Sequence, residues 1–252
     1  MQNFLTKLSH VYKNIKEQSY TLLSNYKLPF SPPPAYLKRH IGKDFLVLCP
    51  GPLLKKHEPQ IKTFIKDENP IIIGCNHSIL LIEPHYQVFC NKRRLNQILN
   101  SFPPGITLIL NSKINTQKIK KQIHKNIRIE PLYYTGEKST HLVINEKTGL
   151  IDATGHTALF VLCTAYLMGA DKIFIAGMDG FKDYFEKNTC RHFDSFSYNN
   201  LDDHSPEVKS KVKYWDEITT LYLKQFWQFC REKNIEVEFL TPSVYSPISR
   251  FE

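Results

Sequence analysis

The chain has 252 residues, 42% of them hydrophobic, which is enough for a full core and argues against global disorder. Its net charge of +9 suits an anionic partner such as nucleic acid, an acidic membrane surface or a phosphorylated substrate, although a general excess of lysine gives the same total. No apolar run approaches the roughly 18 to 20 residues that a membrane-spanning helix needs. The first residues lack the apolar stretch of a signal peptide, so we expect a cytoplasmic protein.

Residues 2–25 predict a basic amphipathic helix, because apolar residues recur at near-helical spacing and lysines supply a polar face. Such a helix can pack on the domain, lie peripherally on the inner membrane or mediate oligomerisation, and the sequence leaves these alternatives open. Prolines between residues 29 and 34 then break the pattern. We therefore expect residues 1–40 to form a helix and a Pro-rich linker, and residues 41–252 to form the main domain.

Strand and helix patterns alternate over the main domain. Short apolar runs bounded by turn residues predict buried strands, and longer periodic runs predict helices. The expected strands are 44–49, 70–75, 87–90, 106–110, a weak strand near 127–129, 171–176 and 235–240. The expected helices are 54–67, 91–99, 114–124, 157–168 and 206–233. Residues 130–150 carry little pattern and predict a loop or a small subdomain, and residues 181–206 are polar and aromatic without periodicity.

This alternation predicts an α/β fold that is Rossmann-like, with a mainly parallel sheet and helices on both faces, plus the N-terminal helix. In such sheets ligands bind beyond the carboxyl ends of the strands. That rule selects residues 49–54, 76–78, 91–94 and the segment from 177 onward as candidate binding positions.

Three of these turns have residues suited to a nucleotide. Gly51 and Pro52 follow the first strand, where a glycine lets the backbone approach a phosphate at a helix start. Asn76 ends the second strand, and its amide can both donate to and accept from a base or ribose. Asn91 opens a run of three cations that suit phosphates. A plain turn, a capping asparagine and a solvated helix face explain the same residues without a ligand.

Polar residues also lie before the apolar helix 157–168 and after strand 171–176. Thr154 and Gly155 come before the apolar helix, where they either cradle an anion or cap the helix. Asp179 follows strand 171–176 and suits ribose hydroxyls or the organisation of its own loop.

The polar segment 181–206 concentrates ionisable side chains. Histidine titrates near neutrality and suits a general base, and a neighbouring carboxylate would orient its ring. The residues concerned are Arg191, His192, Asp194 and His204. A solvated loop is the alternative, and neither this segment nor the six cysteines shows a metal-binding spacing.

The order of these motifs from Phe45 to Pro242 resembles the family 42 bacterial sialyltransferases and the related domain of motility accessory factor proteins. That family has a Gly-x-Gly-Pro-Ser-Leu turn, a strand ending in Cys-Asn, a Thr-Ser-Gly before an apolar helix, a Gly-x-Asp and a loop histidine before a helix and a Pro-Ser element. The matching residues are Cys49–Leu54, Cys75–Asn76, Asn91, Ala153–Gly155, Gly177–Asp179, Phe193–Asp194, His204 and Thr241–Ser243.

The resemblance implies an inverting glycosyltransferase that needs no metal or other cofactor. Its donor would be a nucleotide sugar, with a CMP-sugar of the sialic acid type foremost, and its acceptor a glycan or glycolipid of lipopolysaccharide or capsule. His204 would be the general base, with His192 as the alternative and Asp194 beside them. The nucleotide would contact Gly51, Pro52, Asn76, Asn91, Thr154, Gly155, Asp179 and Arg191.

The sequence also departs from the family. Pro50 and Leu53 replace nucleotide-contacting residues, and Ile151 stands where the family has an arginine. A pterin-type pyrophosphokinase using ATP and magnesium and a catalytically inactive nucleotide- or glycan-binding module therefore stay open. Positive charge alone favours nucleic acid, for which we find no binding motif.

Overall fold

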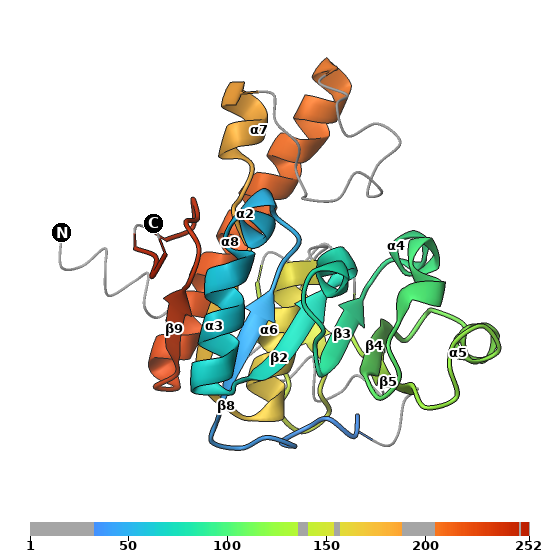
Figure 1. Ribbon diagram of the computed structural model, residues 1–252. Coiled ribbons are helices and arrows are strands. Elements are labelled where there is room, and N and C mark those ends of the chain that lie inside the picture. The colour runs from blue at the N-terminus through green and yellow to red at the C-terminus, as the bar shows by residue number, and fades with distance from the viewer. Residues whose placement is uncertain (1–32, 136–140, 154–156, 188–204, 247, 252) are drawn as a thin grey trace. The chain divides into compact units, whose positions relative to one another are not determined.

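The computed structural model describes residues 33–135, 141–153, 157–187, 205–246 and 248–251 (Figure 1). The chain divides into Met1–Pro33 and a compact unit, Pro34–Glu252. The predicted helix 2–25 lies outside the described residues. Residues from Pro34 to His40, which we expected in the linker, belong to the compact unit: Tyr36 is fully buried, and the backbone N–H of Lys38 donates to the carbonyl of Leu167 at 2.7 Å.

A seven-stranded sheet in which every pairing is parallel organises the compact unit, which confirms the predicted Rossmann-like α/β fold (Figure 1). The strand order is β5-β4-β3-β2-β1-β8-β9. The strands are β1 (Lys43–Leu48), β2 (Ile71–Cys75), β3 (Tyr86–Phe89), β4 (Thr107–Asn111), β5 (Arg128–Leu132), β8 (Ala170–Ala176) and β9 (Glu236–Phe239). A separate antiparallel pair is formed by β6 (Val143–Ile144) and β7 (Ile151–Asp152).

Helices cover both faces of the sheet (Figure 1). One face packs against α6 (Thr157–Met168) and α8 (Pro206–Glu232). The other packs against α2 (Pro52–Lys56), α3 (Glu58–Glu68), η1 (Asn76–Leu80), α4 (Lys92–Gln97), η2 (Leu99–Ser101) and α5 (Thr116–Lys120). α7 (Lys182–Lys187) follows β8. No described helix is both long and apolar enough to cross a membrane.

The period-two alternation of β1 shows how the sequence fills both cores. Phe45 and Val47 are buried in the cluster shared with α6 and α8, whereas Leu46 and Leu48 are buried in the cluster shared with α3. Side chains of successive strand residues point to opposite faces, so a strand covered on both sides must be apolar throughout. That is why the central strands appear in the sequence as continuous apolar runs.

Local signals set the helix ends. Ser205 caps α8, because its side-chain oxygen accepts a hydrogen bond from the N–H of Val208. Pro206 follows in the first turn, where a proline is well tolerated. Asn91 caps α4 by accepting from the N–H of Arg93 at 2.8 Å. α3 ends at Asn69, whose left-handed φ of 48° is a conformation that asparagine tolerates.

Several expected boundaries were wrong. The predicted helix 54–67 is two helices that meet at His57, and the predicted helices 91–99 and 114–124 are shorter than their apolar periodicity indicated. The segment expected to lack periodicity begins with α7, whose six residues are too few to show a helical period.

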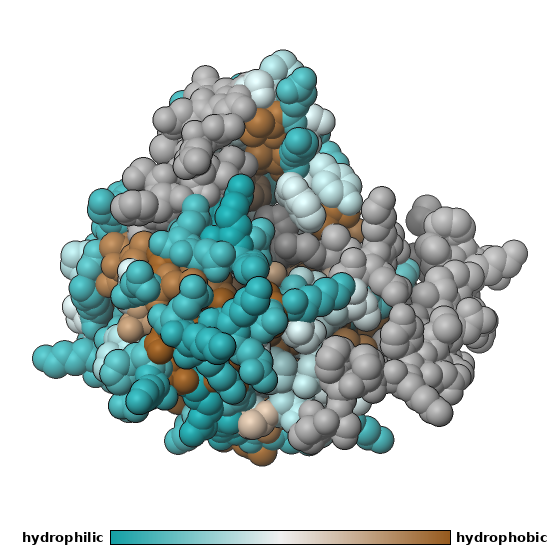
Figure 2. All heavy atoms as spheres, turned by 90° about the vertical axis from the view of Figure 1, so that its right-hand side faces the viewer, coloured by the Kyte–Doolittle hydropathy of each residue, from teal (hydrophilic) through white to brown (hydrophobic). Residues whose placement is uncertain are grey.

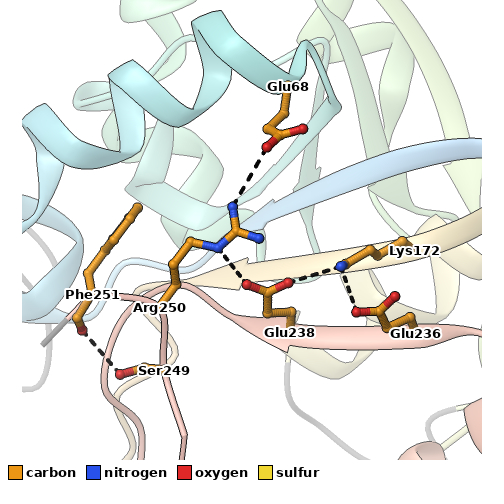
Figure 3. A network of polar contacts seen from close by, with 7 residues as sticks. All are labelled: Glu68, Lys172, Glu236, Glu238, Ser249, Arg250 and Phe251. Carbon is orange, nitrogen blue, oxygen red and sulfur yellow. Dashed lines mark hydrogen bonds and ion pairs between the residues drawn. The ribbon is translucent and has the colours of Figure 1, made fainter.

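The C-terminal residues fasten the β9 edge of the sheet (Figure 3). The Arg250 side chain pairs with Glu238 at 2.6 Å and lies over the Phe64 ring, 5.0 Å from its centroid. Lys172 of β8 bridges the same Glu238 and also Glu236. These contacts tie the chain end to α3 and to two strands at once.

Candidate functional site

A cavity of about 450 Å³ opens at the carboxyl ends of β3, β2, β1 and β8. This is where the strand order reverses, since the chain winds from β1 to β5 on one side and then returns to place β8 on the other. Parallel α/β sheets bind ligands at such a reversal, and the volume suits a small organic molecule. The described lining residues are Cys49, Pro50, Gly51, Cys75, Asn76, Cys90, Asn91, Arg94, Tyr134, Thr157, Ala158, Gly177–Phe181, Val212, Trp215, Thr219 and Tyr245.

The loops after β1 and β8 are clamped together at the centre of this cavity. Gly51 N–H donates to the Gly177 carbonyl at 2.9 Å, and a Cβ on Gly51 would lie 2.4 Å from that oxygen. Gly177 has a left-handed φ of 72°, and a Cβ there would lie 2.1 Å from the Cys49 carbonyl oxygen. Both glycines are therefore required by close backbone approach, and for Gly51 this is a different reason from the phosphate contact expected from the sequence.

Asp179 joins the same two loops through its side chain. Its Oδ2 accepts from the backbone N–H of Leu53 at 2.7 Å, which occupies a donor that the sequence had suggested for a phosphate. Its Oδ1 is buried and accepts no hydrogen bond from the described residues. Burial raises the pKa of the Asp179 carboxyl to about 7, so the group is divided between its acid and its anion near neutral pH.

Asn76 is held in an unusual backbone conformation at the end of β2. Its φ is 50°, in the left-handed region that asparagine adopts more readily than most residues. Buried Gln87 of β3 donates to the Asn76 carbonyl at 2.7 Å. The side-chain Oδ1 of Asn76 is buried and accepts no hydrogen bond from the described residues, and Asn76 is one of the residues that line the cavity.

The start of α4 brings a cation to the cavity. The side-chain oxygen of Asn91 caps the helix, a role that the sequence had suggested for Asn76 and not for Asn91. Arg94, one turn later, is only 7% exposed and lines the cavity. A hydrogen bond with Cys49 and burial raise the pKa of the Cys75 thiol at the end of β2. The charge of Arg94 acts in the opposite direction and lowers that pKa.

Three thiols face the cavity from three neighbouring strand ends, at Cys49, Cys75 and Cys90. Burial raises the pKa of Cys90 to about 12, so it stays protonated at neutral pH. Among the residues that the structure describes, no group of histidine, cysteine and acidic side chains has the arrangement to hold a metal ion. The Cys75 thiol, whose pKa is also raised, and the Cys90 thiol therefore provide an uncharged part of the lining.

One side of the cavity comes from α8 and the C-terminal segment, which sequence reasoning missed. Val212, Trp215 and Thr219 lie on one face of α8 and line the cavity. The Tyr245 hydroxyl donates to Asp216 at 2.8 Å and holds its ring beside them. Their i, i+3, i+7 spacing was a usable signal, but it does not distinguish a cavity face from a core face.

The structure brings together four residues that the sequence selected from separate motifs: Gly51, Asn76, Asn91 and Asp179. Pro52 is exposed at the start of α2 and is absent from the described lining. The other candidates lie outside the described residues: Thr154, Gly155, Arg191, His192, Asp194 and His204. Thr157 and Ala158, which follow Thr154 and Gly155 in the chain, do line the cavity.

The sequence matches no described protein family, and no curated protein matches it.

Proposed function

We propose that the cavity binds the nucleotide of a nucleotide-sugar donor and that the chain is an inverting glycosyltransferase. The observation that carries the proposal is the convergence of Gly51, Asn76, Asn91 and Asp179 on one cavity at the strand-order reversal. Ligands of parallel α/β folds bind at this position. The order of motifs along the sequence points to the same four residues.

The charges and free acceptors of the cavity suit a nucleotide in one orientation. Strands of a sheet are spaced about 4.8 Å apart, so the three intervals from β3 to β8 span roughly 14 Å. Arg94 lies at the β3 end and would neutralise a phosphate. Asp179 follows β8 at the opposite end, where ribose hydroxyls would donate to its carboxylate, and Asn76 follows β2, where its amide would contact the part of the nucleotide nearer the phosphate.

The proposed reaction is a direct displacement at the anomeric carbon. An acceptor hydroxyl of a surface glycan or glycolipid forms a bond to that carbon while the bond from carbon to phosphate oxygen breaks. The electron pair leaves with the nucleotide phosphate, and the acceptor proton passes to a base. By its place in the motif order that base is His204, with His192 as the alternative.

Binding is tested by thermal shifts of the purified chain against CMP, CDP, UMP, UDP, GDP and ATP, each with and without magnesium. We expect a pyrimidine nucleotide, CMP foremost, to raise the melting temperature without magnesium. The test variant is Asp179→Asn, which should weaken the shift in melting temperature. Its matched control is Asp171→Asn at the amino end of the same strand, which should keep that shift. ATP with magnesium as the sole stabiliser would instead favour a pyrophosphokinase.

Turnover is tested separately, with a CMP-sugar donor and a glycolipid acceptor. His204→Ala should lower kcat by roughly 10²- to 10⁴-fold with nucleotide binding unchanged, while His124→Ala, at an exposed histidine of the α5 region, should have no effect. Nucleotide binding without transfer to any acceptor would favour a binding module, and full turnover by His204→Ala would remove that residue from the mechanism.

A further inference from the structure

The net charge of the protein is concentrated in one stretch of sequence. Residues 91–129 contain nine of the 33 lysines and arginines and no aspartate or glutamate. The other residues therefore hold 24 basic and 24 acidic side chains, and the whole net charge of +9 resides in this stretch. A general lysine excess spreads over a chain, so this segregation needs a different explanation.

The fold gathers these charges on one side. Residues 91–129 form α4, η2, β4, α5 and the start of β5, and their apolar side chains share a single buried cluster. Eight of the nine cations are exposed, and Arg94 alone of them is buried. The exposed ones, here called the basic face, are Lys92, Arg93, Lys113, Lys118, Lys120, Lys121, Lys125 and Arg128. Figure 2 turns this side towards the viewer, and hydrophilic side chains cover the centre of its described surface.

Among the residues that the structure describes, seven of these eight cations, all but Arg93, have no acidic partner. Glu130, the first acid after the stretch, is 4% exposed and pairs with Arg39 at 2.8 Å. Charge left uncompensated on a surface repels itself and costs stability, so its retention points to an anionic partner.

We propose that the basic face docks on an anionic lipid bilayer. The inference goes beyond the proposed function and does not depend on the cavity. A polybasic surface near acidic headgroups gains about 1 kcal/mol per lysine or arginine, and the interaction weakens within a Debye length. Six of the eight exposed cations are lysines, which act as point charges and suit a diffuse layer of headgroups.

The same face fits nucleic acid poorly. Single strands are bound by stacking on exposed aromatic rings, and the one aromatic residue between 91 and 129, Phe102, is 8% exposed. Duplex DNA is read by a helix that enters the major groove. α4 and α5 have six and five residues and are too short for that role.

The experiment is co-sedimentation of the full chain with vesicles of phosphatidylcholine alone or with added phosphatidylglycerol. We expect binding only to the anionic vesicles and release at about 0.5 M salt. The test variant changes Lys118, Lys120, Lys121 and Lys125 to Gln. The control removes the same charge from exposed lysines of other elements, Lys55, Lys66, Lys211 and Lys224.

The four substitutions on the basic face should weaken vesicle binding on the order of 100-fold or more, and the control set by much less. Two results would overturn the proposal: no binding of the unaltered chain to anionic vesicles, or equal binding by the two variants, which would place the contact elsewhere. Tighter binding to an oligonucleotide than to vesicles, lost in the same variant, would assign the face to nucleic acid instead. Circular dichroism of both variants shows whether they are folded.

Discussion

At Asp179, one carboxylate oxygen accepts from the backbone N–H of Leu53 at the start of α2, and the other is buried and accepts no hydrogen bond from the described residues. The folded protein keeps this proton up to about pH 7, whereas the unfolded chain releases it near pH 3.9. The unfolded state therefore binds fewer protons in that window, and the free energy of unfolding falls as pH rises from about 4 to 7. A buried acid that destabilises the fold at neutral pH is expected where binding, rather than stability, fixes the residue.

Asp179→Asn should remove this pH dependence, because the amide oxygen still accepts from Leu53 N–H and the buried charge is gone. Between pH 5 and pH 8 the unfolding free energy of the unaltered protein should fall by on the order of 2 kcal/mol more than that of the variant. Urea unfolding at the two pH values measures the difference. Parallel pH profiles for the two proteins would contradict a raised pKa at this site.

Gly51→Ala tests the loop clamp. The added Cβ meets the Gly177 carbonyl and the Asp179 carboxylate at 2.4 and 2.5 Å, so we expect a loss of roughly 1–3 kcal/mol or more in unfolding free energy, together with the loss of nucleotide binding. Gly105→Ala is the comparison, since it has a left-handed φ of 94° but no atom within 4 Å. It should cost about 1 kcal/mol through backbone strain and leave binding intact. If both substitutions weakened nucleotide binding equally, the contact between the two loops would not be what the cavity needs for binding.

Among the helices, the junction of α2 and α3 contains an unusual residue. His57 is 2% exposed, neither ring nitrogen has a hydrogen-bond partner among the described residues, and the ring stacks on Phe251. Burial and the charge of Lys56 lower the pKa of His57. The unfolded chain therefore takes up this proton first, and stability falls as pH drops below about 6.5.

His57→Phe should stabilise the protein by about 1 kcal/mol at pH 7.5 and by more at pH 5, because two unsatisfied buried nitrogens are replaced by apolar ring atoms. Thermal unfolding at both pH values measures this. A lower melting temperature of the variant at both pH values would contradict this expectation and show that the imidazole itself stabilises the junction.

Arg250 tests the fastening of the sheet edge. Removing its side chain deletes the ion pair with Glu238 and the stacking on Phe64 and Phe174. Arg250→Ala should lower the unfolding free energy by roughly 1–3 kcal/mol, and Arg250→Lys should recover only part, since an ammonium group stacks less well than a guanidinium. Arg231→Ala, at an exposed arginine of α8, should change stability by less than about 0.5 kcal/mol.

For the molecule as a whole, the charge of the basic face lowers the stability of the fold. Its exposed cations repel one another, so raising the salt concentration from about 0.05 to 0.5 M should raise the melting temperature. The four Lys→Gln substitutions on this face should melt higher than the unaltered chain at low salt, and the difference should vanish at high salt. The control set, spread over α2, α3 and α8, should show neither effect.

Much of the fold was predictable because period and apolarity are local signals. The apolar run Thr157–Met168 predicted the helix α6 at its observed bounds. Every strand of the parallel sheet was also predicted, and most of the predicted strand ends lie within about two residues of the observed ends. Residues such as Gly51 and Asp179 were found because the carboxyl-end rule converts strand positions into site positions. Trp215 was not found, because its spacing on α8 does not distinguish a cavity face from a core face, and Tyr245 was not found, because it reaches the cavity through tertiary packing. The role of Gly51 was also missed, since its close neighbour, Gly177, comes from a distant strand.

The central strand has a consequence for synthesis on the ribosome. β1 pairs with β2 on one side and with β8 on the other, and β8 is made only after β2 to β7. Until then the apolar residues Phe45 to Leu48 border an open edge that can capture other chains. A nascent chain halted before β8 should therefore be held by chaperones or lost to aggregation, and slow translation between β5 and β8 would lengthen that exposure.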